Sequence, residues 1–147
     1  EYTQFGYQAN KALRAGADPA TTPGVVEIDR LLTRNRLDAA HTVYRVVEGF
    51  VTSGLKVGDR FTDKGFMSVT QSPRVAARIM RGGVTKDSDP SAQRNIITVQ
   101  LPKGTPAVDP HWGSPFSYEA ELVLPRGLSF EVTAIKDGNV TGMRVVR

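Results

Sequence analysis

The spacing of apolar residues divides the chain into helical and extended stretches. Apolar residues recur every three or four positions in some stretches, and short β-branched or apolar runs bounded by turn residues lie between them. The predicted helices cover residues 2–15, 25–37 and 73–81, and the predicted strands cover residues 42–47, 66–70, 96–101, 119–124, 128–136 and 139–146. Two helices followed by mostly antiparallel strands with one intervening helix predict the α+β fold class.

Turn and capping residues support several of these boundaries. Gly16 is expected to end the first helix, and Ser72 followed by Pro73 is expected to cap and begin the third. Asp137-Gly138 is typical of a type I′ turn, so the last two strands should form a hairpin. The expected buried stripes contain Val25, Ile28, Leu31 and Leu32 in the second helix and Val75, Ile79 and Met80 in the third.

The strand predicted at residues 119–124 begins with two carboxylates, Glu119 and Glu121. Side chains alternate between the two faces of a strand, so both glutamates should lie on one face together with Val123. The face toward the core is expected to contain Tyr118, Ala120, Leu122 and Leu124. Two like charges side by side cost free energy when they are partly buried, so we infer that the glutamates serve a function.

Composition narrows the possible chemistry. At 147 residues the chain is expected to form one domain, residues 1–147, and its first residue, Glu1, indicates a domain excised from a longer protein. The absence of cysteine excludes disulfides, thiolate metal sites and cysteine nucleophiles, and the two histidines, His41 and His111, are too few for a histidine-rich metal cluster. A net charge of +4 favours anionic partners. No apolar run approaches the ~20 residues that a membrane span needs, so we expect none.

Three short motifs occur in a characteristic order along the chain. They are Tyr44-Arg45, then residues 66–70 with Ser68 at their centre, then Glu119-Ala120-Glu121. This order resembles the mono-ADP-ribosyltransferases of the arginine–serine–glutamate class, NAD-dependent enzymes of the bacterial toxin and effector type, and among them the arginine-specific Glu-x-Glu subgroup. Secondary matches extend the resemblance over nearly the whole chain, at Tyr2-Thr3, Gly6-Tyr7, Asn10, Leu13, Arg14, residues 63–66 and residues 124–127. The resemblance implies a core of two packed, mostly antiparallel β-sheets with N-terminal helices and one intervening helix.

The resemblance assigns roles to four residues of these motifs. Glu121 would bond the ribose 2′-OH of NAD and stabilise the oxocarbenium-like charge that develops as nicotinamide leaves. Arg45 would hold the phosphates of NAD, because a guanidinium stays charged and grips phosphate oxygens in a fork. Ser68 would contact NAD and orient the catalytic carboxylate, although Val69 replaces the threonine that follows this serine in the family. Glu119 would orient an acceptor arginine and help to remove its proton, since a guanidinium has a pKa above ~12.

Five further residues are site candidates by the same resemblance. Asn10 and Arg14 on the first helix, and Arg94 just before the strand at residues 96–101, would contact NAD. Phe116 and Trp112, in the loop before the glutamates, would recognise the substrate. Plainer interpretations stay open for them, such as a solvated helix face for the first two and a loop anchor for Phe116.

The sequence therefore predicts an NAD-dependent mono-ADP-ribosyltransferase that moves ADP-ribose to an arginine side chain of a target protein and releases nicotinamide, without a metal. The alternatives are a glycoside hydrolase or NAD glycohydrolase, an ADP-ribosyltransferase acting on nucleic acid, and a basic nucleic-acid-binding module. Against the last of these, the chain lacks the interleaved aromatic and basic pattern of single-strand binders. The expected partners are NAD, a target protein with an acceptor arginine, and a cognate immunity protein or delivery domain. The expected location is that of a secreted or delivered effector acting in the cytosol of a target cell.

Overall fold

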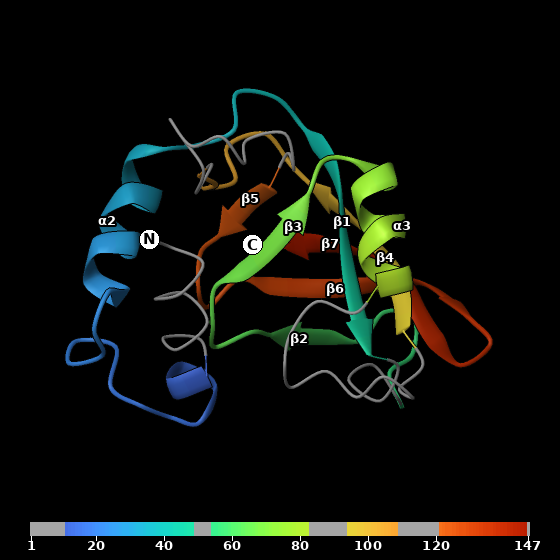
Figure 1. Cartoon of the computed structure of the whole chain (residues 1–147), viewed down its shortest axis with the longest axis horizontal. Coiled ribbons are helices and arrows are strands. Elements are labelled where there is room, and N and C mark those ends of the chain that lie inside the picture. Colours follow the sequence, from blue (N-terminus) through green and yellow to red (C-terminus); the bar gives the residue numbers. More distant parts are fainter. Residues whose placement is uncertain (1–10, 49–53, 83–93, 109–120, 147) are drawn as a thin grey trace.

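Two helices and seven strands form the part of the chain that a computed structural model describes, residues 11–48, 54–82, 94–108 and 121–146 (Figure 1). In chain order the elements are α2 (Val25–Arg34), β1 (His41–Glu48), β2 (Arg60–Thr62), β3 (Met67–Thr70), α3 (Pro73–Gly82), β4 (Arg94–Leu101), β5 (Glu121–Leu124), β6 (Ser129–Lys136) and β7 (Asn139–Val146). Residues 11–14 are also helical, and Gly16 follows them at a φ of 95°.

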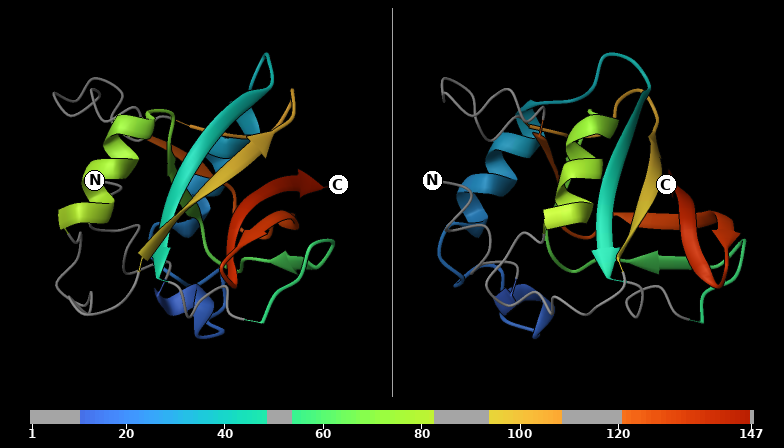
Figure 2. Two further views of the ribbon diagram at one scale, coloured as in Figure 1. Left: turned by 90° about the vertical axis from the view of Figure 1, so that its right-hand side faces the viewer. Right: turned by 45° about the vertical axis from the view of Figure 1, so that its right-hand side comes forward.

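The strands form one hydrogen-bonded sheet in the order β2-β6-β7-β4-β1-β3-β5. All neighbouring strands are antiparallel except β4 and β7, which pair in parallel. The predicted α+β class is confirmed, and the two sheets expected from the family are joined at the β4–β7 pair. Figure 1 shows β2 and β6 running across the direction of β1 and β4, and Figure 2 shows α3 on one side of β1 and β4 with β6 and β7 on the other.

Strand β5 is buried on both of its faces. Leu122 and Leu124 belong to the larger apolar cluster, which contains buried residues of β1, β3, β4, β6 and β7. Val123 belongs to a second cluster with Leu13, Phe66 and the buried side of α2. The predicted burial of Leu122 and Leu124 is confirmed. The burial of Val123 was not predicted, and it arises because α2 covers the face that Val123 shares with Glu121.

Helix α2 is shorter than predicted and buries fewer residues. It ends at Arg34, because Asn35 is extended and its side-chain amide donates a 2.6 Å hydrogen bond to the carbonyl of Leu31. Leu37 instead exchanges backbone hydrogen bonds with residues 104 and 105. Leu31 is 50% exposed, since Val25, Ile28 and Leu32 alone share the stripe that faces the core. Asp29 on the same helix accepts bonds from Nε and Nη2 of Arg126 at 3.0 and 2.8 Å, which attaches α2 to the turn after β5.

The local turn signals were confirmed. The Ser72 hydroxyl accepts a 3.2 Å hydrogen bond from the Val75 amide, as expected of an N-cap. Asp137 and Gly138 have φ values of 53° and 80°, which connect β6 and β7 as a type I′ turn requires. In α3 the fully buried residue is Ala76, whereas Val75 is half-buried; the side chains of Ile79 and Met80 lie outside the described residues.

A row of polar side chains crosses five strands of the sheet. Arg60, Glu131 and Arg144 lie opposite one another on β2, β6 and β7, and the row continues to Gln100 and Thr42. Arg144 Nε donates to Glu131 at 2.9 Å, and Arg60 Nε lies 3.5 Å from the same carboxylate. The hydrogen bond from Arg144, with the charges of both arginines, holds the pKa of Glu131 below its ordinary value of 4.5.

Replacing Glu131 by glutamine should lower the melting temperature at neutral pH, because both arginines lose the carboxylate that they share. The pKa of Glu131 is lowered by folding, so its contribution is present above the unfolded value of about 4.5 and is lost as the pH falls through the lowered pKa. Melting curves by circular dichroism should therefore show a gap between wild type and Glu131→Gln that closes in acid. A gap of equal size at neutral and acidic pH would contradict this account.

Candidate functional site

The three motif residues Arg45, Ser68 and Glu121 come together on adjacent strands β1, β3 and β5. Tyr44 lies opposite Thr70, and Thr70 lies opposite Glu121, so one cross-strand row passes through all three strands. Arg45 follows the first member of this row, and Ser68 precedes Thr70 by two residues. Strand β5 thus pairs with a strand that is about fifty residues earlier in the sequence.

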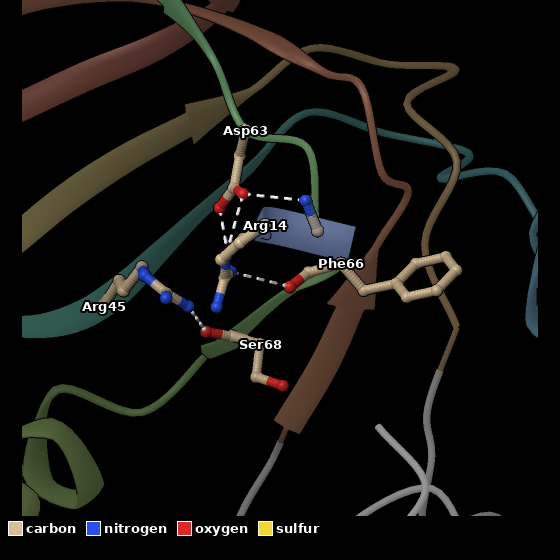
Figure 3. A network of polar contacts seen from close by, with 6 residues as sticks. Arg14, Arg45, Asp63, Phe66 and Ser68 are labelled. Carbon is tan, nitrogen blue, oxygen red and sulfur yellow. Dashed lines mark hydrogen bonds and ion pairs between the residues drawn. The ribbon is translucent and has the colours of Figure 1, made fainter. Parts of the chain in front are cut away.

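Strands β1 and β3 pair at one position only, Tyr44 with Thr70. On the side toward Ser68 the two strands separate, and the guanidinium of Arg45 takes the place of backbone pairing by donating from Nη1 to the Ser68 carbonyl at 2.9 Å. Figure 3 shows this oxygen, and that of Phe66, directed away from β5. The uncovered carbonyl edge of β3 is therefore bonded by side chains.

The second carbonyl of this edge is bonded by Arg14, from the end of the first helix. Arg14 Nη2 donates to Phe66 O at 3.2 Å, while Nε and Nη2 donate to the two oxygens of Asp63 at 3.1 and 2.9 Å (Figure 3). Asp63 also accepts from the Gly65 amide at 2.8 Å, so its carboxylate is fixed against the turn before β3. Arg14 is 42% exposed and Asp63 is 17% exposed, which leaves the guanidinium the more accessible partner.

Two guanidinium groups thus lie at carbonyls two residues apart on one strand edge, a spacing of about 7 Å by the strand rise. Guanidinium groups remain charged at all ordinary pH and form forked hydrogen bonds to phosphate oxygens. The arrangement of Arg14 and Arg45 is chemically suited to an anion with two phosphate groups. Their charge is partly balanced by Asp63.

Glu121 and the two hydroxyl residues of β3 have different surroundings. Glu121 and Ser68 are half-buried. They lie on the same face of the sheet, because Glu121 is opposite Thr70 and Ser68 is two residues before Thr70 on the same strand. Thr70 is 6% exposed, and its hydroxyl accepts a 3.1 Å bond from the Ser72 amide. Thr70 therefore supports the turn into α3, and Glu121 is the residue of β5 that lies opposite it.

Several predicted site residues cannot be placed against this arrangement. Asn10, Trp112, Phe116 and Glu119 lie outside the described residues. Arg94 is the first residue of β4, opposite Glu48, and its side chain lies outside the described part. These roles stay predictions.

Sequence reasoning missed Asp63 as a site residue. It treated residues 63–66 only as the approach to the serine strand, whereas the structure shows that Asp63 holds Arg14 in place. The two residues are 49 positions apart, so no local pattern relates them. Only the folded arrangement reveals the pair.

Among residues 11–48, 54–82, 94–108 and 121–146, no three histidine, aspartate or glutamate side chains gather as a metal site would require. No helix in these ranges is long and apolar enough to cross a membrane.

Comparison with solved structures identifies similar folds. Plx2a, an ADP-ribosyltransferase toxin from Paenibacillus larvae, is 19% identical with a TM-score of 0.71, over 99% of this chain and 82% of that one. Exoenzyme S from Pseudomonas aeruginosa, in a complex with human 14-3-3 protein beta and bound to carba-NAD, is 18% identical with a TM-score of 0.65, over 98% and 68%. The Vis toxin, an ADP-ribosyltransferase from Vibrio splendidus, in complex with agmatine is 18% identical with a TM-score of 0.61, over 99% and 71%.

Sequence comparison extends this likeness to the family. No protein with curated annotation matches the chain significantly. Residues 1–146, however, match the sequence model of one family along almost their whole length. The chain belongs to the ADP-ribosyltransferase exoenzyme family.

Proposed function

We propose that this ADP-ribosyltransferase moves ADP-ribose from NAD to the guanidinium group of an arginine side chain on a target protein. The observation that carries the proposal is the meeting of Arg45, Ser68 and Glu121 on adjacent strands, with Glu119 two residues before Glu121 in sequence. NAD is the substrate of ADP-ribosyltransferases, and the carba-NAD complex of exoenzyme S supports its use here.

The two arginines on the edge of β3 would bind the pyrophosphate of NAD. Arg45 and Arg14 donate to backbone carbonyls two residues apart, those of Ser68 and Phe66, and Asp63 keeps Arg14 in position. Glu121 would lie beside the ribose, where its carboxylate stabilises the positive charge that develops as the bond to nicotinamide breaks. Ser68 would orient that carboxylate from the neighbouring strand.

Glu119 would orient the acceptor arginine and take up its proton. Two residues of spacing in an extended chain put side chains on one face, so its carboxylate would lie next to that of Glu121. In the transfer, a guanidinium nitrogen bonds to the anomeric carbon of the ribose, the carbon–nitrogen bond to nicotinamide breaks, and the nitrogen releases one proton toward Glu119. The complex of the Vis toxin with agmatine, itself a guanidinium compound, supports an acceptor of this chemistry.

We further propose that residues 1–147 form a single catalytic domain and that the protein acts as a delivered toxin in the cytosol of a target cell. The family match over residues 1–146 supports the first statement, and the toxins among the similar structures support the second. A cognate immunity protein and a delivery domain stay predictions.

The function can be tested with the purified protein, NAD and agmatine. We expect mass spectrometry to detect ADP-ribosyl-agmatine together with an equal amount of free nicotinamide. Release of nicotinamide and free ADP-ribose with no modified agmatine would instead identify an NAD glycohydrolase. Labelling of added RNA or DNA in preference to agmatine would identify a nucleic-acid acceptor. The net charge of +4 is compatible with such an acceptor.

Replacing Arg45 by lysine should raise KM for NAD about tenfold with a smaller effect on kcat. Lysine keeps the charge but lacks the fork that can hold the Ser68 carbonyl and a phosphate oxygen together. The matched control is Arg36→Lys, since Arg36 also donates from Nη1 to a backbone carbonyl, that of Gly104 at 3.1 Å, in an exposed position. Steady-state kinetics in NAD should be unchanged for the control, and an unchanged KM for Arg45→Lys would contradict the assignment.

A further inference from the structure

Helix α3 carries a charge pattern that weakens the helix itself. Its ten residues contain Arg74, Arg78 and Arg81 and no acidic residue. Arg74 and Arg78 are exposed and four positions apart, so they are neighbours on one face, where like charges repel. Arg74 also lies in the first turn, where the positive end of the helix dipole disfavours a cation. Neither of these two arginines forms an ion pair with another described residue.

Helix α2 provides a comparison within the same molecule. It also carries two exposed arginines four positions apart, Arg30 and Arg34. There, Glu27 occupies the first turn and Arg34 the last, so both termini have the charge that the helix dipole favours. Helix electrostatics accounts for the arginines of α2 and does not account for those of α3.

The position of α3 connects its arginines with the site. The helix begins three residues after Thr70, and the Thr70 hydroxyl bonds the amide of its N-cap residue Ser72. Fully buried Ala76 marks the side of α3 that packs inward, and the helix contacts β1, β3 and β4. Figure 1 shows α3 beside β1, the strand that carries Arg45, and the helix also contacts β3, which carries Ser68. A macromolecule approaching these strands from that side would meet Arg74 and Arg78.

We propose that the exposed face of α3, formed by Arg74 and Arg78, docks an acidic surface next to the acceptor arginine of the target protein. This inference rests on the proposed function. The acceptor guanidinium is itself a cation and gains no attraction from Arg74 and Arg78, whereas carboxylates around the acceptor supply attraction to α3. Such complementary charges raise the association rate and suppress wrong partners, and they act less strongly at high salt.

The test compares two synthetic peptides, each with a single arginine flanked on both sides either by glutamates or by glutamines. At low salt we expect wild type to modify the glutamate peptide with a kcat/KM about tenfold higher, and we expect high salt to remove most of this preference. In Arg74→Glu/Arg78→Glu the preference should disappear or reverse. Transfer to agmatine, which has no carboxylates to interact with α3, should stay within about twofold of wild type.

Matched variants distinguish an effect of the α3 face from an effect of the net charge of the protein. Arg30→Glu/Arg34→Glu makes the same change in net charge at the same spacing on α2, and it should keep the preference of wild type. Arg74→Gln/Arg78→Gln removes the repulsion within α3, so it should fold at least as well as wild type and still lose the preference. Circular dichroism melting curves verify the folding of all variants.

Each outcome points to one conclusion. Retention of the preference by both α3 variants, or its loss in the α2 variant alone, overturns the docking face. A second result would overturn the protein partner in favour of nucleic acid. In it, wild type shows no preference for the glutamate peptide but binds a single-stranded RNA in a salt-sensitive way, and the α3 variants bind that RNA more weakly. Failure of wild type to modify agmatine overturns the proposed function instead, independently of the peptides.

Discussion

Glu121→Gln should lower both nicotinamide release and transfer to agmatine by about 10²- to 10³-fold, the usual effect of removing one group that stabilises transition-state charge. Glutamine keeps the shape of the side chain and its place opposite Thr70 but removes the negative charge. Since Glu121 is proposed to act on the bond to nicotinamide, every reaction that begins with its cleavage should slow alike. Chromatography of nicotinamide and ADP-ribosyl-agmatine from the same samples measures both rates.

Glu131→Gln is the matched control for this change. It makes the same substitution at a half-buried strand residue of the same sheet, in β6, where the partners of the carboxylate are Arg60 and Arg144. We expect this variant to keep the wild-type rates. Wild-type nicotinamide release by folded Glu121→Gln would show that the catalytic carboxylate lies elsewhere.

Glu119→Gln should separate the two activities. Transfer to agmatine should fall by about 10²-fold, the lower end of what a positioned general base contributes. Hydrolysis of NAD in the absence of agmatine should stay within a few-fold of wild type, because water needs no anion to orient it as a guanidinium does. The ratio of ADP-ribosyl-agmatine to free ADP-ribose is the informative measurement.

The result for Glu119→Gln is interpreted by comparison with the result for Glu121→Gln. If Glu119→Gln loses hydrolysis and transfer together, as Glu121→Gln should, Glu119 acts on NAD and the division of roles is wrong. If it loses neither, the acceptor is held by other residues. The double variant should resemble Glu121→Gln, since the bond to nicotinamide must break before an acceptor matters.

Features that depend on nearby residues could be predicted from the sequence. The start of α3 follows from Ser72 and Pro73, and the β6–β7 turn follows from Asp137-Gly138, because each involves atoms within a few residues of one another. The strand locations of Arg45 and Ser68 follow in the same way from the short β-branched runs that contain them. The side-by-side placement of their strands required the family resemblance.

Features that depend on distant packing could not be predicted. Whether Val123 is buried depends on α2, almost one hundred residues earlier, and strand alternation cannot reveal a helix on the second face. The short strand β2 was not predicted, because three residues are too few to show a pattern, and it is held by its pairing with β6. The bond of Arg14 to Asp63 joins charges that in sequence alone could equally face water.

The single pairing between β1 and β3 has a thermodynamic consequence. Along that seam the sheet is joined by one residue pair and by the side chain of Arg45, so few backbone bonds oppose a change in the angle between the strands. A diphosphate held by Arg14 and Arg45 would link the first helix, β1 and β3 at once. Binding of the ligand and closing of the seam then form one coupled equilibrium, in which each stabilises the other by the same free energy.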